Sequence, residues 1–261
     1  MEKKYKEYME KKIVDKGQKF DFGKTSKEYG KYRDIYPKEL FDKLYELGIG
    51  KEGSNWLDLG TGTGVIPRGM AKYGANITAT DISKSQIEEA ILLSKEMPNI
   101  NYEVKSEEEI DYEPKSFDAI TACQCFWYFD PNIIVPKIKS ILKPGGIFIK
   151  VYMSYMKEEQ ITQDSNSLVK KINGSWNGAS ASIQDLKTHY FDNPHMDTMV
   201  VDLPFTRETW HGRMMASRGV MASMNSEKIE RFNKEHMAML IEKYPEEFTV
   251  KHKLFLTWYY I

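Results

Sequence analysis

Short apolar runs alternate with helical stretches between residues 55 and 153, and this alternation constrains the fold more than any other feature of the sequence. The runs have the length and residue types of strands and occupy 55–59, 76–80, 100–104, 117–123 and 146–153. Strands that alternate with helices form a parallel sheet with helices on both faces. We therefore predict an α/β fold.

The regions outside this alternation follow other patterns. Helices are expected over 37–48, 206–223 and 226–243, and further strands near 198–204 and 247–260. The last strand is expected at the edge of the sheet or as an antiparallel insertion, with these residues on one face: Phe248, Val250, Leu254, Leu256, Trp258 and Tyr260. Residues 156–196 are polar and show only weak helical patterns.

Two helix starts have recognisable signals. Ser83 and Gln86 predict a capping box for a helix that extends to about Met97. Asp130 predicts an N-cap, because Pro131 follows it at the first helical position.

Composition narrows the class of protein. Hydrophobic residues make up 41% of the 261 residues, which suffices for a large core, and no apolar run is long enough for a membrane span. Lys and Arg number 37 against 38 Asp and Glu, so a protein that mainly grips nucleic-acid phosphates is not expected. Cys123 and Cys125 fit neither a disulfide framework nor a zinc site. We expect a cytoplasmic protein without a bound metal.

The most informative segment is 56–71, in which an apolar strand ends at Asp58 and is followed by Gly60, Gly62 and Gly64. Glycines permit a tight turn with positive φ, and they let a ligand approach the backbone closely. The helix that follows offers free N–H groups at its N-terminus. The turn could therefore hold a nucleotide, and a turn without any ligand is the alternative.

The spacing of the glycines decides between nucleotide classes. A dinucleotide site requires G-x-G-x-x-G, but the third glycine is replaced by Val65 in one register and by Pro67 in the other. The spacing D-x-G-x-G-x-G instead resembles motif I of class I S-adenosylmethionine (SAM) dependent methyltransferases.

Asp81 supports a ribose-containing ligand. It ends the second strand, seventeen residues after Gly64, where an acid can bind both ribose hydroxyls. A nicotinamide dinucleotide site would use the same acid, so Asp81 points to a ribose and not to the methyl donor. The alternative is a helix-capping Asp ahead of Ile82 and Ser83.

Three further segments resemble the same family. Residues 104–120 resemble the stretch after its third strand, with Ser106 where an Asp is common. Residues 121–131 resemble the segment after the fourth strand of small-molecule members such as the trans-aconitate type, with Trp127 in place of a His. Tyr29, Arg33 and Tyr36 resemble a segment that folds over the donor in many members.

The resemblance implies a Rossmann-like single domain over 1–261, with a mostly parallel seven-stranded sheet and a helical cap. Its SAM-binding core would be 37–153, completed by the strands near 198–204 and 247–260. Segments 1–36, 156–196 and 205–246 would cover the substrate.

The resemblance also implies site residues. The expected SAM contacts are Tyr29, Arg33, Asp58, Gly60, Gly62, Gly64, Asp81, Ile82, Ser106, Glu107, Glu108 and Gln124. The expected acceptor contacts are Tyr36, Trp127, Tyr128, Tyr152, Trp210 and Arg213, with Arg213 facing an acidic group of the acceptor.

The predicted reaction is methyl transfer from SAM to a small-molecule acceptor, with S-adenosylhomocysteine as the product. Methyl transfer needs alignment more than acid–base groups, so no catalytic residue is assigned. His236 and His211 are candidate bases, although a His on an apolar helix stripe is more often a core residue.

Alternative functions stay open. A SAM-binding regulatory or partner protein without catalysis would carry the same glycine turn, and a nicotinamide-dependent oxidoreductase fits the glycine spacing poorly. The signatures of adenine and C5-cytosine DNA methylation are absent from the sequence, so no nucleic-acid partner is expected. The chain is expected to be a monomer or a homodimer.

Overall fold

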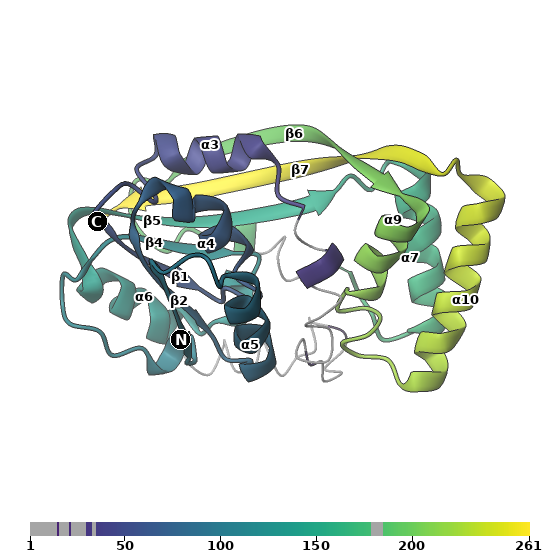
Figure 1. Ribbon diagram of the computed structural model, residues 1–261, viewed down its shortest axis with the longest axis horizontal. Helices are drawn as coiled ribbons and strands as arrows, with labels where there is room; N and C mark the ends of the chain where they lie inside the picture. The colour runs from purple at the N-terminus through teal and green to yellow at the C-terminus, as the bar shows by residue number, and fades with distance from the viewer. Residues whose placement is uncertain (1–14, 16–20, 22–29, 33–34, 179–184) are drawn as a thin grey trace. The chain divides into compact units, whose positions relative to one another are not determined.

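A seven-stranded sheet organises the part of the chain that the computed structural model describes, namely residues 15, 21, 30–32, 35–178 and 185–261 (Figure 1). The strand order is β3-β2-β1-β4-β5-β7-β6. The strands are β1 (Asn55–Leu59), β2 (Asn76–Asp81), β3 (Ile100–Val104), β4 (Phe117–Cys123), β5 (Leu142–Tyr155), β6 (His195–Thr206) and β7 (Glu247–Tyr260).

The first five strands of the sheet pair in parallel, as the alternation predicts. In the register of the central strand, Leu59 lies beside Thr80 of β2 and Ala122 of β4. The carboxyl ends of these strands therefore meet at one edge, which is where parallel α/β sheets bind ligands.

The β7 strand is an antiparallel insertion. The Gly145 N–H donates to the Ile261 carbonyl, and the Met156 N–H donates to the Lys251 carbonyl. These bonds show that β5 and β7 run in opposite directions. β7 lies between β5 and β6, which leaves β6 as the edge strand.

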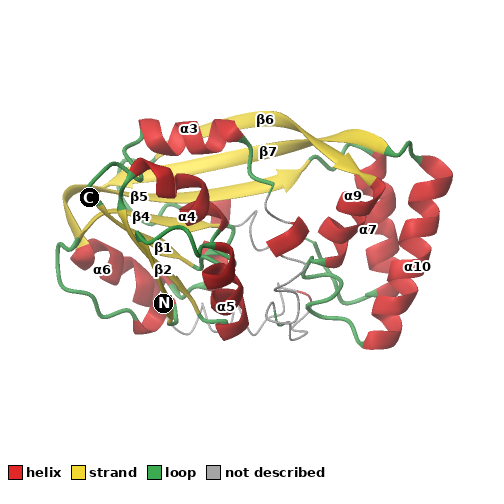
Figure 2. Cartoon of the chain, in the orientation of Figure 1, coloured by secondary structure: helices red, strands yellow, loops and turns green. Residues whose placement is uncertain are grey.

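Helices of unequal length connect the strands (Figure 2). They are α3 (Lys38–Glu46), α4 (Val65–Met70), α5 (Lys84–Leu93), α6 (Pro131–Ile141), α7 (Gln160–Ile172), α9 (Arg207–Met215) and α10 (Ser226–Lys243), with short 3-10 turns η3 (Ala71–Tyr73), η4 (Glu107–Glu109) and η5 (Phe126–Tyr128).

The chain divides into two compact units. Unit 1 holds 1–35, 153–181 and 199–254, and unit 2 holds 36–152, 182–198 and 255–261. In unit 1, α10 packs against α7 and α9. Unit 2 contains β1–β4 and α3–α6, so it includes the glycine turn and most of the predicted SAM contacts. The domain division predicted from the sequence stays an interpretation.

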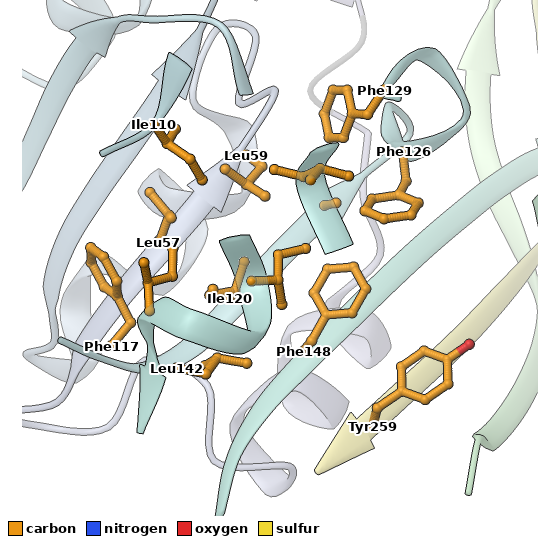
Figure 3. Close-up of a cluster of buried hydrophobic side chains, with 14 of the residues drawn as sticks. Leu57, Leu59, Ile110, Phe117, Ile120, Phe126, Phe129, Leu142, Phe148 and Tyr259 are labelled. Carbon is orange, nitrogen blue, oxygen red and sulfur yellow. The ribbon is translucent and has the colours of Figure 1, made fainter. Parts of the chain in front are cut away.

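The main apolar cluster of unit 2 lies around β1, β4 and β5 (Figure 3). Leu57, Ile120 and Phe148 are fully buried, and the Phe148 ring lies 5.1 Å from that of Phe126. Burial of such side chains stabilises a fold by about 2 kcal/mol each. The cluster thus anchors the strand ends that carry the predicted site.

Several local predictions are confirmed and others are wrong. Asp130 caps α6 by accepting a hydrogen bond from the Asn132 N–H, as predicted. The capping box is wrong: Ser83 occupies the N-cap of α5 but its hydroxyl pairs with that of Ser85, and the helix ends at Leu93. The weakly patterned region contains the 13-residue helix α7.

The predicted face of β7 is only partly correct. Val250, Leu254 and Leu256 are buried together as expected, but beyond them Tyr259 is buried and Tyr260 is 54% exposed. The strict alternation breaks where Leu256 and Thr257 are both buried.

Among the described residues, none of the helices has both the length and the apolarity that a membrane crossing requires.

Candidate cofactor and acceptor site

The glycine turn follows β1 directly and leads into α4. Gly60, Gly62 and Gly64 have φ values of 60°, 58° and 74°, a left-handed conformation that other residues rarely adopt. The Thr61 N–H donates to the Thr80 carbonyl of β2 over 2.8 Å, which fixes the turn at the ends of both strands.

Two of these glycines are also required by the protein's own packing. A Cβ on Gly60 would lie 2.8 Å from Sγ of Cys125, and a Cβ on Gly64 would lie 2.2 Å from the Tyr102 hydroxyl. The sequence suggests that the glycines make room for a ligand. The structure adds that Gly60 and Gly64 make room for neighbouring side chains.

Asp81 ends β2 and binds the turn. Its Oδ2 accepts a hydrogen bond from the Gly62 N–H and its Oδ1 accepts one from the Ser83 N–H, each over 2.8 Å. Burial raises the pKa of Asp81, and these two hydrogen bonds oppose the rise. A carboxylate oxygen has two lone pairs, so each oxygen retains one for a ligand hydroxyl. The Ser83 N–H precedes α5, whose N-cap is Ser83 itself, so Asp81 does not cap the helix and that alternative is wrong. The ribose contact stays a prediction.

Asp58 is a second carboxyl at this edge, and its side chain is almost fully buried. Thr121 donates its hydroxyl proton to Oδ1 of Asp58 and accepts a hydrogen bond from Nε1 of Trp56. Burial raises the pKa of Asp58 to about 7, and the charge of Asp81 adds to the rise while the Thr121 hydrogen bond opposes it. Asp58 can therefore exchange a proton near neutral pH.

The next predicted contacts follow β2 and β3 in the chain. Ile82 is 70% exposed and directly follows Asp81. The Ser106 hydroxyl donates to Oε2 of Glu109, and Oε1 of Glu108 accepts a hydrogen bond from the Asp130 N–H over 3.3 Å. Glu107 begins η4, and its side chain lies outside the described part of the chain.

Gln124 follows β4 with a φ of 63°, although it is not a glycine. Its N–H donates to the Val151 carbonyl of β5 over 2.9 Å, so the position is held by the neighbouring strand. Such backbone strain is concentrated at functional sites. Here it redirects the chain out of β4 into the aromatic turn η5.

The predicted acceptor contacts of unit 2 lie together. Trp127 contacts Tyr128, with ring centroids 5.3 Å apart, and meets Tyr152 of β5 edge-on, with centroids 5.5 Å apart. Tyr152 in turn stacks on Phe255 at 6.0 Å. All four rings are only partly buried, so they offer an aromatic surface. Phe255 was not predicted, because the sequence does not indicate which β7 residue neighbours Tyr152.

The predicted acceptor contacts of unit 1 are buried. Trp210 is fully buried, and its Nε1 donates to the Ser165 hydroxyl. Arg213 is 5% exposed, with its guanidinium 5.6 Å from the centre of the Tyr155 ring. Arg213 is therefore not a solvated surface arginine. The roles of both residues in acceptor binding stay predictions.

The two candidate bases form a buried pair in unit 1. Nδ1 of His211 lies 2.8 Å from Nδ1 of His236, and their other ring nitrogens bond to Asn233 and Ser165. Burial lowers the pKa of His211, and burial together with His211 lowers the pKa of His236 to about 3. Both rings are thus neutral at pH 7.

The aromatic segment ahead of the core is only partly described. Tyr36 is half-buried in unit 2, whereas Tyr29 and Arg33 lie outside the described residues. Their predicted contacts with the donor stay predictions.

Comparisons with known proteins agree with this geometry. Residues 57–150 match a family model described as a methyltransferase domain. The ubiquinone biosynthesis O-methyltransferase of Xanthomonas campestris pv. campestris is 38% identical over 97 residues, which cover 36% of this chain and 41% of that protein. The enzyme of the same name from Alkalilimnicola ehrlichii is 36% identical over 116 residues, which cover 43% of this chain and 47% of that protein. The chain spans less than half the length of these curated relatives.

Solved structures share the fold. A protein from Anaeromyxobacter dehalogenans, provisionally described as a type II methyltransferase, superposes with a TM-score of 0.62 at 18% identity, over 86% of this chain and 96% of that one. The YcgJ protein of a Bacillus species superposes with a TM-score of 0.53 at 17% identity, over 85% and 98%. Residues 57–150 therefore match a methyltransferase domain, and the chain has the mostly parallel, seven-stranded Rossmann-like fold of class I methyltransferases.

Proposed function

We propose that this protein transfers a methyl group from SAM to a small-molecule acceptor and releases S-adenosylhomocysteine. The observation that carries the proposal is the glycine turn with its D-x-G-x-G-x-G spacing, to which the Asp81 carboxylate is bonded while each of its oxygens retains a lone pair. Two ribose hydroxyls can donate to those lone pairs. The exposed side chain of Ile82 is next to them and can cover one face of an adenine ring.

The remaining parts of the donor can be assigned by charge. The methionine moiety carries an ammonium group, and Asp58 is the carboxyl at the end of the adjacent central strand. Once ionised, Asp58 would attract that ammonium. Gln124, held by the Val151 carbonyl, can hydrogen-bond to the donor at the end of β4.

The acceptor would bind beside Trp127, Tyr128 and Tyr152. SAM supplies a methyl carbon activated by positively charged sulfur, and transfer requires the acceptor's lone pair in line with the carbon–sulfur bond. Aromatic faces attract a sulfonium by cation–π interaction, and they exclude water from the acceptor. No proton acceptor is assigned, so the proposal applies to acceptors that present a free lone pair.

The proposal is tested by calorimetric titration with SAM and by transfer of labelled methyl from SAM into a small-molecule cell extract. Asp81→Ala should weaken SAM binding by ~2–4 kcal/mol, because two charge-assisted hydrogen bonds are lost. Glu88→Ala on the exposed side of α5 is the matched control and should bind SAM normally. Unchanged affinity in a folded Asp81→Ala protein would remove the assignment.

A SAM-binding regulatory protein is the second candidate, since the glycine turn and Asp81 fit both. The two differ in methyl transfer alone. SAM binding without any labelled product from a broad extract would favour the regulator.

A further inference from the structure

Lys150 is a buried charge in the middle of an apolar strand. It lies between Ile149 and Val151 on β5, and its side chain is only 4% exposed. Lysine is almost never fully buried unless it is paired. The proposed reaction leaves Lys150 without a role.

The Lys150 ammonium is fully satisfied by hydrogen bonds. Nζ donates to the Asp185 carbonyl over 2.7 Å, to Oδ2 of Asp185 over 3.0 Å and to the Thr188 carbonyl over 3.2 Å. An ammonium group has three N–H donors, so these three acceptors use all of them. Burial lowers the pKa of Lys150, and the Asp185 carboxylate opposes this effect. The three acceptors engage Nζ completely, so Lys150 is not available as a base or a nucleophile.

Lys150 lies on the face of β5 that packs against η5. Alternate residues of a strand share a face, so Phe148, Lys150 and Tyr152 point the same way. Phe148 contacts Phe126 at 5.1 Å, Nζ of Lys150 lies 5.8 Å from the Phe126 ring, and Tyr152 contacts Trp127 at 5.5 Å. One face of β5 therefore contacts both Phe126 and Trp127 of η5.

A second segment, residues 185–190, connects Lys150 to Phe126 of η5. The Tyr190 hydroxyl donates to Oδ1 of Asp185 over 2.8 Å, and the Tyr190 ring lies 4.7 Å from Nζ of Lys150. The same ring meets Phe126 edge-on, with centroids 5.0 Å apart. Lys150, Asp185, Tyr190 and Phe126 thus form a closed ring of contacts within unit 2.

We infer that Lys150 is a positioning residue: by binding Asp185 and Thr188 it holds Tyr190 against Phe126, and so fixes Trp127 where the acceptor is bound. The inference rests on the proposed function, because it assigns acceptor binding to Trp127. Buried ion pairs are often no more stabilising than apolar residues of similar volume, so stability alone does not explain the Lys150–Asp185 pair. A positioning role does.

The test replaces the ion pair by neutral residues. Lys150→Met with Asp185→Asn keeps the net charge, and the side-chain oxygen of the introduced asparagine can still accept the Tyr190 hydrogen bond. Lys143→Met is the matched control, because Lys143 is on the same strand and forms an ion pair with Asp118 near its start. The proteins are labelled with 5-fluorotryptophan, and the resonance of Trp127 is assigned with Trp127→Phe.

We expect the Trp127 resonance to shift or broaden in the double variant, while the other four tryptophan resonances stay in place. In Lys143→Met, all five should stay. The affinity for S-adenosylhomocysteine should stay within about twofold, because the SAM contacts are untouched. Transfer of labelled methyl into a small-molecule extract should fall by at least about tenfold, because a misplaced acceptor loses rate steeply.

A double variant that is less stable but has an unchanged Trp127 resonance and unchanged transfer would overturn the inference and leave Lys150 a structural residue. If the double variant does not fold, Asp185→Asn alone is judged by the same two measurements. A wild-type protein that does not bind S-adenosylhomocysteine would defeat the proposed function, whereas the Trp127 resonance would still report whether Lys150 fixes the turn.

Discussion

The paired histidines of unit 1 should make the protein sensitive to acid. His211 and His236 bond to each other and to Asn233 and Ser165, none of which carries a negative charge. One proton between the two Nδ1 atoms satisfies both rings. A second proton there would place two N–H groups face to face, and it would bury a charge without a counter-ion.

The sign of the effect follows from proton binding. The pKa of His236 is about 3 in the folded protein against 6.5 for a free histidine, so below pH 6.5 the unfolded chain binds more protons. The stability contributed by the neutral pair is present above pH 6.5 and is lost as the pH falls toward 3. At pH 5 the loss from His236 amounts to about 2 kcal/mol, from about 1.4 kcal/mol per pH unit. The lowered pKa of His211 acts in the same direction.

Urea unfolding of the wild type and of His236→Gln, at pH 7.5 and pH 5, measures this contribution. Comparison with a variant is needed because the raised pKa of Asp58 acts oppositely, stabilising the fold as the pH falls from 7. The difference in free energy of unfolding between wild type and variant should shrink by about 2 kcal/mol at pH 5. His195→Gln, which removes an exposed histidine, is the control. An equal difference at both pH values would refute the reasoning.

Three further outcomes follow from the site. Gly60→Ala should destabilise the fold by about 1–3 kcal/mol in thermal unfolding, because its Cβ meets Cys125 and its φ is 60°, and adding Cys125→Ala should restore part of the loss. SAM binding at pH 6.5 should release a fraction of a proton, measured by calorimetry in buffers of different ionisation enthalpy, and Asp58→Asn should abolish the release. Arg213→Ala should raise the acceptor KM at unchanged SAM affinity, and steady-state kinetics with no change in KM would count against its predicted contact.

The sequence predicts the strands of the core, and the adjacency of the glycine turn and Asp81, because both depend on local patterns. Residues 55–59, 100–104 and 117–123 form strands at the predicted bounds. Helix α10 also has its predicted bounds, since its apolar stripe is regular. The glycine turn and Asp81 are adjacent because neighbouring parallel strands end at one edge, which a sequence with this alternation implies.

Features that depend on tertiary contacts could not be predicted in this way. The buried face of α7 includes Thr162 and Ser165, so its polar composition hides an amphipathic helix. The His211–His236 pair joins α9 and α10. The sequence does not indicate which sides of these two helices pack together. Lys150 could have been singled out from the sequence, because it is a charged residue inside an apolar strand. Its partner Asp185 could not, because it is 35 residues away and no pattern links the two.

Asp58 on β1 and Asp81 on β2 show how one arrangement can serve both the fold and the proposed ligand. Asp81 is held by the N–H groups of Gly62 and Ser83, so its carboxylate is oriented before any ligand arrives, and little further ordering is required on binding. Asp58 is buried between strands, and its pKa of about 7 leaves it partly protonated at neutral pH. A cationic ligand would shift that proton off the carboxyl, whereas a neutral one would not. The two acids therefore suit a ligand that carries both a ribose and a positive charge, and the proposed donor SAM combines these two features.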